Sequence, residues 1–406
     1  MSLKNNVIFT HKELRNFCTY RLIFGISYSF LIPVIPLFFD SIGMTTVTIG
    51  LFLSLYGLSK TIAQIPFGVI TDSVGDKLTL VVALLFMTFV PFAYNLSQEH
   101  YIAGGLYVLQ GAILGMAAPA TYSVLARSLD PKRRGQSTGL AAAVFTFGGA
   151  IGAAIGGYLV SQFSNYRLVF YLASLGIGFT FVYVIFFIHK GMKGKPHHHP
   201  KHPSQQPENR LVGIFKEIKK YNLTSKIVVL GSIAFLGDFI YGCVVALFHF
   251  YGQDVLGAST GYTSSIISIY LLVFGLGAPI AGYISDKIGN SKQIFLSFCI
   301  MNASLLGLGV LRNIPLFTVV IICYFLGATF MNASLQSSLS EFGENPKIKG
   351  LVFGFVGASE SLGCAVGPLI AAWVYELNHN WFFFLLLIVS SIVSTIYLIL
   401  RKKAAI

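Results

Sequence analysis

Three charged side chains stand within long apolar stretches of this sequence. Lys60, Asp238 and Glu360 each lie near the middle of a run long enough to cross a bilayer as a helix. A charge at the centre of a membrane costs roughly 3 kcal/mol on insertion scales, so it usually faces a partner or a water-filled cavity. Carboxylates in such places can take up and release protons, which makes these three residues candidates for proton coupling. The alternative is that all three form static pairs that only help the helices to pack.

Several polar side chains share helix faces with these charges. Tyr56 and Gln64 lie one turn to either side of Lys60, and Tyr241 lies one turn from Asp238. Further candidates for a substrate cavity are Arg21, Tyr28, Asn332 and Gln336. A long basic side chain can instead extend its charge to the membrane interface, which is the interpretation we favour for Arg21. The i, i+4 pair Asn332 and Gln336 could equally form hydrogen bonds between helices.

Composition identifies a membrane protein. Hydrophobic residues make up 55% of the chain and charged residues only 11%, and the mean hydropathy is +0.73. The net charge of +13 does not indicate nucleic acid binding, because the basic residues are not gathered on a soluble domain with aromatic platforms. The five cysteines are isolated, with neither paired nor CxxC spacing, so we expect no disulfide framework, metal cluster or cofactor.

Twelve apolar runs are long enough to cross a bilayer as helices. They cover residues 17–39, 48–70, 77–95, 101–126, 136–160, 168–189, 227–250, 261–284, 292–311, 315–340, 350–375 and 381–400. One long polar segment, residues 190–226, separates the first six from the last six. We therefore expect an all-α membrane protein with an N-terminal six-helix bundle in residues 1–189, a linker in residues 190–226 and a C-terminal six-helix bundle in residues 227–406.

The linker has two parts with different compositions. The first part is rich in proline and contains His197, His198, His199 and His202. Imidazoles bind zinc, copper or nickel, but no carboxylate or cysteine lies beside them and the prolines give no fixed geometry, so we favour a disordered linker over a metal site. The second part, residues 210–221, places apolar side chains at helical spacing against lysines. This pattern predicts a short amphipathic helix on the membrane surface.

The lysines and arginines predict the orientation in the membrane. If the N-terminus is cytoplasmic, 25 of the 28 basic residues fall on the cytoplasmic side. Cytoplasmic loops of membrane proteins carry such an excess of lysine and arginine. We therefore expect a multi-pass plasma membrane protein with both termini and the linker in the cytoplasm.

A short polar loop, punctuated by glycines, occurs twice in the chain. Its first copy contains Gly68, Asp72 and Gly75, and its second copy contains Gly282, Asp286 and Gly289. Each residue of the second copy follows its counterpart by 214 positions, and Lys77 and Lys287 lie close to the two aspartates. Repetition at about half the chain length indicates an internal duplication.

A second pattern repeats at nearly the same interval. Pro131, Arg134 and Gly139 recur 215 positions later as Pro346, Lys349 and Gly354. Both copies continue as a ladder of small residues, which are Gly148, Gly152, Gly156 and Gly157 in the first and Gly363, Gly367 and Pro368 in the second. Such spacings let helix backbones approach closely inside a bilayer. Two six-helix halves in the same orientation are an architecture found in secondary transporters.

These motifs resemble the major facilitator superfamily, and specifically its drug:proton antiporter branch. The resemblance rests on the loop between the second and third spans, on the glycine ladder of the fifth span, and on the sequence Pro-Val-Ile-Pro at residues 33–36. It implies twelve helices in two pseudo-symmetric six-helix bundles, a monomer, and transport by alternating access. The chain departs from the family pattern at Ser73 and Asp76, where bases are usual, at Ala153, where proline is usual, and at Tyr107, where a buried arginine is usual.

The resemblance also implies roles for individual residues. Spans two and eleven pack together in the family, so Lys60 is expected to pair with Glu360 and to leave Asp238 as the unpaired acid that carries the proton. The first loop is expected to act as a two-state latch, in which Asp72 engages Arg127 and the start of span eleven in the outward-open state.

The glycines of the loop have separate expected roles. Gly68 should permit close packing, and Gly75 should permit a tight turn. The second copy of the loop keeps Lys287 and is expected to hold the more intact charge network.

The first functional hypothesis is a secondary active transporter that exports small amphipathic organic compounds, in the manner of a multidrug exporter, in exchange for protons. A second hypothesis is proton- or ion-coupled uptake of a metabolite. A third is a membrane receptor or metal sensor that does not transport and uses the histidine-rich linker. The sequence contains no phosphate-binding loop and no nucleophile motif, so we expect no enzymatic activity.

Overall fold

The computed structural model describes residues 12–97, 99–128, 134–163, 165–189, 224–340 and 346–404. Within these ranges the regular secondary structure is helical, with no strand. Twelve segments are long and apolar enough to cross a membrane, which confirms the predicted all-α fold with twelve spans.

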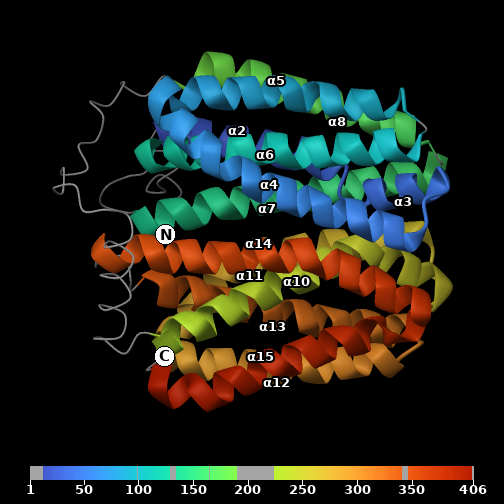
Figure 1. The fold of residues 1–406 in the computed structure, drawn as a ribbon, viewed down its shortest axis with the longest axis vertical. Helices are drawn as coiled ribbons and strands as arrows, with labels where there is room; N and C mark the ends of the chain where they lie inside the picture. Colours follow the sequence, from blue (N-terminus) through green and yellow to red (C-terminus); the bar gives the residue numbers. More distant parts are fainter. Residues whose placement is uncertain are drawn as a thin grey trace, which may run out of the picture. The chain divides into compact units, whose positions relative to one another are not determined.

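The helices begin and end within a few residues of the predicted apolar runs (Figure 1). The first span consists of α2 (Lys12–Ser29) and α3 (Val34–Ser41). The following spans are α4 (Thr46–Val74), α5 (Asp76–Tyr94), α6 (His100–Ser128), α7 (Arg134–Phe163), α8 (Tyr166–Phe187), α10 (Thr224–Asp254), α11 (Thr260–Ile288), α12 (Asn290–Val310), α13 (Ile314–Ser340), α14 (Pro346–Leu377) and α15 (Phe382–Ala404), with a 3₁₀ turn, η3 (His379–Trp381), before α15.

The first span is interrupted, whereas the sequence predicts one helix over residues 17–39. Pro33 precedes α3 with φ −76° and ψ −14°, and because proline has no N–H it cannot continue the hydrogen bonds of the preceding helix. The Leu31 N–H bonds to the Tyr28 carbonyl oxygen at 3.1 Å in a tighter turn. The break therefore follows from a proline that the sequence analysis treated only as part of a family motif.

The chain divides into two compact units. Unit 1 contains residues 1–193, 243–276 and 368–379, and unit 2 contains residues 194–242, 277–367 and 380–406. Within unit 1, α4 packs on α6, α2 on α7 and α8, and α5 on α6 and α8; within unit 2, α12 packs on α13 and α15. The exact bundle boundaries at residues 189 and 227 stay a prediction.

The glycine ladder of α7 lies directly against the backbone of α2. A Cβ added at Gly148 would lie 2.7 Å from the Leu22 carbonyl oxygen, and one added at Gly156 would lie 2.5 Å from the Phe30 carbonyl oxygen. Gly152 makes the same kind of approach to the Ile26 carbonyl oxygen. Any larger side chain would have to push the helices apart, so these glycines set the α2–α7 distance.

Unit 2 repeats this contact between α10 and α14. A Cβ at Gly363 would meet the Phe235 carbonyl oxygen and would lie 2.8 Å from the Phe239 nitrogen. Gly363 follows Gly148 by 215 positions, and Phe235 follows Leu22 by 213. The same pairing of residues in both units confirms that the duplication extends to helix packing.

The two glycine-marked loops are tight turns, as predicted. Gly75 has φ +107° and joins α4 directly to α5, and Gly289 has φ +87° and joins α11 to α12. A side chain at either position would be strained, because only glycine adopts such angles readily. The close packing predicted at Gly68 is absent from the described residues, since an added Cβ there would meet no atom within 4 Å, and the same holds for Gly282.

Some predicted features lie outside the described residues. They include the four histidines of the linker, the amphipathic helix at residues 210–221, and the contacts of Asp72, Arg134, Gly139 and Asp286. The predictions for these residues stay predictions.

Candidate substrate-binding and proton-coupling sites

A hydrogen-bonded network of tyrosine and glutamine joins four helices of unit 1. Tyr28 of α2 and Tyr56 of α4 share a hydrogen bond of 2.5 Å between their hydroxyl oxygens. Gln110 Nε2 of α6 donates to the Tyr28 hydroxyl at 3.3 Å, and the Tyr94 hydroxyl of α5 donates to Gln110 Oε1 at 2.8 Å. Gln110 is only 1% exposed, so its bonds satisfy polar atoms that water does not reach. We call these four residues the tyrosine–glutamine network.

An aromatic stack extends this network. Tyr107 of α6 lies against Tyr56, with ring centroids 4.5 Å apart and planes inclined by 16°, and it meets Phe39 edge-on at 5.7 Å. Tyr107 is 8% exposed. Tyr107, where the family resemblance implies a buried arginine, is thus part of a neutral aromatic stack.

The sequence analysis identified Tyr28 and Tyr56 but missed Tyr94, Tyr107 and Gln110 as members of the site. Gln110 stands within an apolar run and could have indicated this network from the sequence. A buried amide needs hydrogen-bond partners, so other polar groups must lie near it. The partners themselves could not be read from sequence spacing, since they come from different helices.

Lys60 lies on α4, one turn beyond Tyr56, and is half-buried, as is Gln64. Among the described residues of unit 1, no hydrogen bond or ion pair of the Lys60 ammonium group is found. Its predicted partner Glu360 belongs to unit 2, so the pairing of Lys60 with Glu360 stays a prediction.

Arg21 makes a contact that the sequence analysis did not foresee. The guanidinium carbon of Arg21 lies 3.8 Å from the centroid of the Phe145 ring of α7. This is the geometry of a cation–π interaction, which stabilises a charge at a partly desolvated site by about 1–2 kcal/mol. The half-buried Arg21 side chain is therefore held against a neighbouring helix, in addition to any approach to the interface.

Asp238 and Glu360 both belong to unit 2 and are half-buried, as is Tyr241. Each of the two carboxylates takes part in a polar or electrostatic interaction within the structure. The prediction that Asp238 is unpaired is therefore wrong. In α13, Asn332 is half-buried and Gln336 is exposed, and their role in a substrate cavity or in hydrogen bonds between helices stays a prediction.

An ion pair joins α5 to α6 at the end of the bundle that the sequence predicts to be cytoplasmic. Arg127 Nε donates to Asp76 Oδ2 at 2.7 Å, and Arg127 Nη2 donates to the His189 carbonyl oxygen at 2.6 Å. Lys77 Nζ donates to the Ile185 carbonyl oxygen of α8 at 2.6 Å. Asp76 is only 8% exposed and also accepts the Lys77 N–H at the start of α5. We call this group the Asp76 clamp.

The clamp changes the predicted role of Arg127. The sequence analysis paired Arg127 with Asp72 and counted Asp76 only as a departure from the family motif, whereas the structure pairs Arg127 with Asp76. Asp76 can hold this position because a carboxylate at the first turn of a helix is stabilised by the helix dipole.

The second copy of the loop has a different arrangement. Asn290 stands 214 positions after Asp76 and accepts a hydrogen bond from Ser285, while Lys287 lies over the Tyr283 ring at 4.5 Å. Among the described residues the Asp76–Arg127 pair belongs to the first copy. The side chain of Asp286 lies outside the described residues, so the expectation that the second copy has the more intact charge network stays a prediction.

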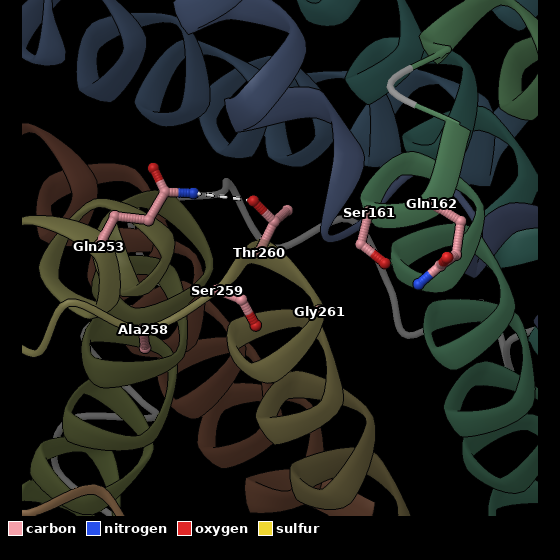
Figure 2. A pocket seen from close by; sticks show the side chains of 7 residues that line it. All are labelled: Ser161, Gln162, Gln253, Ala258, Ser259, Thr260 and Gly261. Atoms are coloured by element: carbon pink, nitrogen blue, oxygen red, sulfur yellow. Dashed lines mark hydrogen bonds between the residues drawn. The ribbon is translucent and has the colours of Figure 1, made fainter.

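Unit 1 also contains a polar pocket of about 510 Å³ near the C-terminal end of α7 and the start of α11 (Figure 2). Its lining residues are Ser161, Gln162, Gln253, Ala258, Ser259, Thr260 and Gly261. Gln253 Nε2 donates to Thr260 Oγ1 at 3.1 Å. The lining is uncharged, and Gly157 of α7, one turn before Ser161, meets Ser264 of α11.

Comparison with known proteins decides the family. The profile of the Major Facilitator Superfamily matches residues 17–345. The chain belongs to the major facilitator superfamily. Members of this superfamily are transporters and not enzymes, so this chain is a multi-pass membrane transporter.

Two curated relatives are drug resistance proteins. The chain is 23% identical over 359 residues to the quinolone resistance protein NorA of Staphylococcus aureus (strain COL), with 86% of each chain covered. It is also 23% identical over 360 residues to multidrug resistance protein 2 of Bacillus subtilis (strain 168), covering 87% of this chain and 86% of the relative.

Solved structures with the same fold include transporters of other kinds. A mutant of the nucleoside transporter NupG has a TM-score of 0.75 at 12% identity, covering 96% of this chain and 99% of its own. A bacterial homologue of the human lysosomal transporter Spinster has a TM-score of 0.73 at 13% identity and covers 97% of both chains. These similarities show the major facilitator fold with its two six-helix bundles.

Proposed function

We propose that this transporter exports small amphipathic organic compounds across the plasma membrane in exchange for protons. The two relatives, which are named for quinolone and multidrug resistance, support the class of substrate. The presence of two carboxylates, Asp238 and Glu360, on packed helices within the spans supports the coupling to protons. The excess of basic residues in the predicted cytoplasmic segments supports cytoplasmic termini.

The carboxylates lie on or beside one helix contact. Gly363 of α14 rests on the turn of α10 between Phe235 and Phe239, and Asp238 belongs to that turn. Glu360 lies three residues before Gly363, which places it within one turn of the same contact on α14.

Neighbouring carboxylates oppose each other's charge, so we propose that Asp238 and Glu360 share one proton. We infer that release of this shared proton on one side of the membrane, and its uptake on the other, couples the conformational cycle to the proton gradient. The Lys60 ammonium group is the candidate cation that would balance the charge of these carboxylates in one conformation of the transport cycle.

The test is transport in proteoliposomes that contain the full-length protein, with a quinolone as the probe and an imposed pH gradient. Export predicts that the probe accumulates in inverted vesicles that are acidic inside, and uptake predicts accumulation in the opposite orientation. Asp238→Asn and Glu360→Gln should each reduce accumulation driven by the gradient by roughly tenfold or more, the scale expected when a charge interaction of about 1.4 kcal/mol is lost.

Glu376→Gln is a matched control, because Glu376 lies on the same helix α14 but is exposed at its C-terminal end. This variant should accumulate the probe as the wild type does. Unchanged proton coupling in both Asp238→Asn and Glu360→Gln would contradict the proposal. Absence of any flux, combined with retained binding, would favour a receptor instead.

A further inference from the structure

Two cations of unit 1, Arg21 on α2 and Lys60 on α4, lie away from the ends of their helices, and both are half-buried. Among the described residues of unit 1 neither forms an ion pair with a carboxylate. Arg21 is in contact with the Phe145 ring, which attracts the charge but does not neutralise it. A cation within a bilayer is costly where its own bundle supplies no carboxylate to neutralise it, so the positions of Arg21 and Lys60 are a candidate site for an anion.

The tyrosine–glutamine network allows the positions of Arg21 and Lys60 along their helices to be compared. Tyr28 and Tyr56 are joined by a hydrogen bond, which fixes one level that α2 and α4 share. Arg21 precedes Tyr28 by seven residues, and Lys60 follows Tyr56 by four. Both spacings keep the cation on the face of its tyrosine.

Successive spans run in opposite directions, so both cations lie on the same side of the tyrosine pair. This is the side that the sequence predicts to face the cytoplasm. With a rise of 1.5 Å per residue, Arg21 lies about 10 Å and Lys60 about 6 Å along the helix axis from the level of the two tyrosines. The backbones of Arg21 and Lys60 therefore differ in depth by only about 4 Å, on the predicted cytoplasmic side of the uncharged rings of Tyr28 and Tyr56.

We propose that Arg21 and Lys60 bind the anionic group of the substrate, and that the substrate is an amphipathic organic anion such as an aryl carboxylate. The guanidinium of Arg21 and the ammonium of Lys60 would each donate charge-assisted hydrogen bonds to the carboxylate. The apolar body of the substrate would lie against the rings of Phe145, Tyr56 and Tyr107, which supply flat apolar surface without charge. This inference rests on the proposed function, because it names the chemical class of the exported compound.

The test is equilibrium binding to the purified full-length protein in detergent, measured by calorimetry without any gradient. Three matched probes share one ring system, which are 1-naphthoate, 1-naphthylmethylammonium and the neutral 1-naphthalenemethanol. We expect 1-naphthoate to bind about tenfold more tightly than the neutral compound, since hydrogen bonds to charged groups contribute about 1.5–3 kcal/mol. The advantage should fall as the salt concentration rises.

Substitutions assign the effect to the two cations. Arg21→Gln and Lys60→Gln should each reduce the affinity for 1-naphthoate towards that of the neutral compound, whereas Lys60→Arg should retain most of it. Lys292→Gln is the control for net charge, because Lys292 is an exposed residue of α12 in unit 2. The salt dependence of the wild type tests the same point without a variant, so misfolding of either Gln variant does not remove the test.

The inference would be overturned by equal binding of all three probes, by a preference for the cation, by absence of 1-naphthoate binding, or by unchanged affinity in Arg21→Gln and Lys60→Gln. Its failure can be distinguished from failure of the proposed function. Proton-driven export without a preference for anions would reject only the anion site. A preference for anions without proton-driven flux would reject only the export.

Discussion

At the scale of single residues, the glycines of α7 show how strictly backbone contact restricts the sequence. A Cβ at Gly152 would overlap the carbonyl oxygen of Ile26, and a backbone atom in a packed helix cannot move aside without moving the helix. A Cβ at Gly105, on α6, would meet no atom within 4 Å. Two glycines in membrane helices thus face very different constraints.

Gly152→Ala is expected to destabilise the protein by about 1–3 kcal/mol, the usual cost of overpacking a close contact. The measurement is the thermal unfolding midpoint of the purified protein in detergent. Gly105→Ala is the matched control, since alanine also favours helix, and its midpoint should stay the same or rise. Equal midpoints for the two variants would show that α2 and α7 can separate at little cost.

The Asp76–Arg127 pair gives a second prediction at this scale. Asp76→Asn should destabilise the protein by about 2 kcal/mol, because it leaves the partly buried Arg127 without its counter-charge. Arg127→Gln should have a similar effect, and the double variant should cost less than the sum of the two single ones, as expected for residues that interact directly. Thermal unfolding midpoints of the four proteins complete the cycle, and strict additivity would indicate that the pair contributes nothing of its own.

At the scale of helices and loops, the tight turn at Gly75 between α4 and α5 sets the position of the Asp76 clamp at the start of α5. The positive φ of Gly75 allows α5 to start immediately after α4, so that Asp76 occupies the first turn of α5 and reaches Arg127 on α6. The clamp therefore depends on the turn as well as on the charges.

Gly75→Ala is accordingly expected to weaken the clamp by about 1 kcal/mol or more, because alanine is strained at φ +107°. We expect a lower thermal unfolding midpoint together with faster proteolysis after residues of the turn. Gly68→Ala is the control on the same loop, since an added Cβ there meets no atom within 4 Å. If Gly68→Ala were as harmful as Gly75→Ala, the contacts of Gly68 in another state of the transport cycle would deserve more weight than the turn.

The helices and the loops also differ in how far the sequence could predict them. The twelve spans and the glycine ladder were predictable, because a bilayer fixes the length of a helix and only small residues allow close contact. The break before Pro33 was missed because the apolar run continues through it. The pairing of Asp76 with Arg127 and the bonds of Gln110 were missed because they join residues of different helices, whose relative rotation is set by packing and not by local spacing.

At the scale of the whole molecule, alternating access requires that contacts near the polar pocket open and close. The pocket lies where α7 approaches α11 in unit 1 (Figure 2). A Cβ added at Gly261 would lie 3.6 Å from the Ser161 Cβ, within the range of 3.5–4.5 Å that a disulfide needs. A covalent bond there would hold the two helix ends together.

We predict that Ser161→Cys combined with Gly261→Cys, in a background without the five native cysteines, forms a disulfide and stops transport. Reduction should restore transport to the level of the uncrosslinked protein. Ser161→Cys combined with Gly257→Cys is the control, since a Cβ at Gly257 meets no atom within 4 Å. Crosslinking is measured by gel mobility after the linker is cleaved, because only a disulfide then holds the two fragments together. Full transport in the oxidised protein would show that α7 and α11 do not separate here during the cycle.

The repeated contact of α2 with α7 and of α10 with α14 has one more consequence, which concerns descent. Leu22 and Gly148 correspond to Phe235 and Gly363 because both pairs make the same approach. The next equivalent positions lie three residues later on the first helix of each pair and three residues earlier on the second. These are Gly25 and Phe145 in the first half, and Asp238 and Glu360 in the second.

The two equivalent positions of this repeated helix contact thus hold different residue types in the two halves. In the first half the pair holds a glycine and an aromatic ring, with a Cβ at Gly25 lying 2.6 Å from the Phe145 carbonyl oxygen, and the ring carries the charge of Arg21. In the second half the same two positions hold acids. The two copies of one packing contact have therefore diverged, so that one lies beside a cation held on a ring and the other carries two acids.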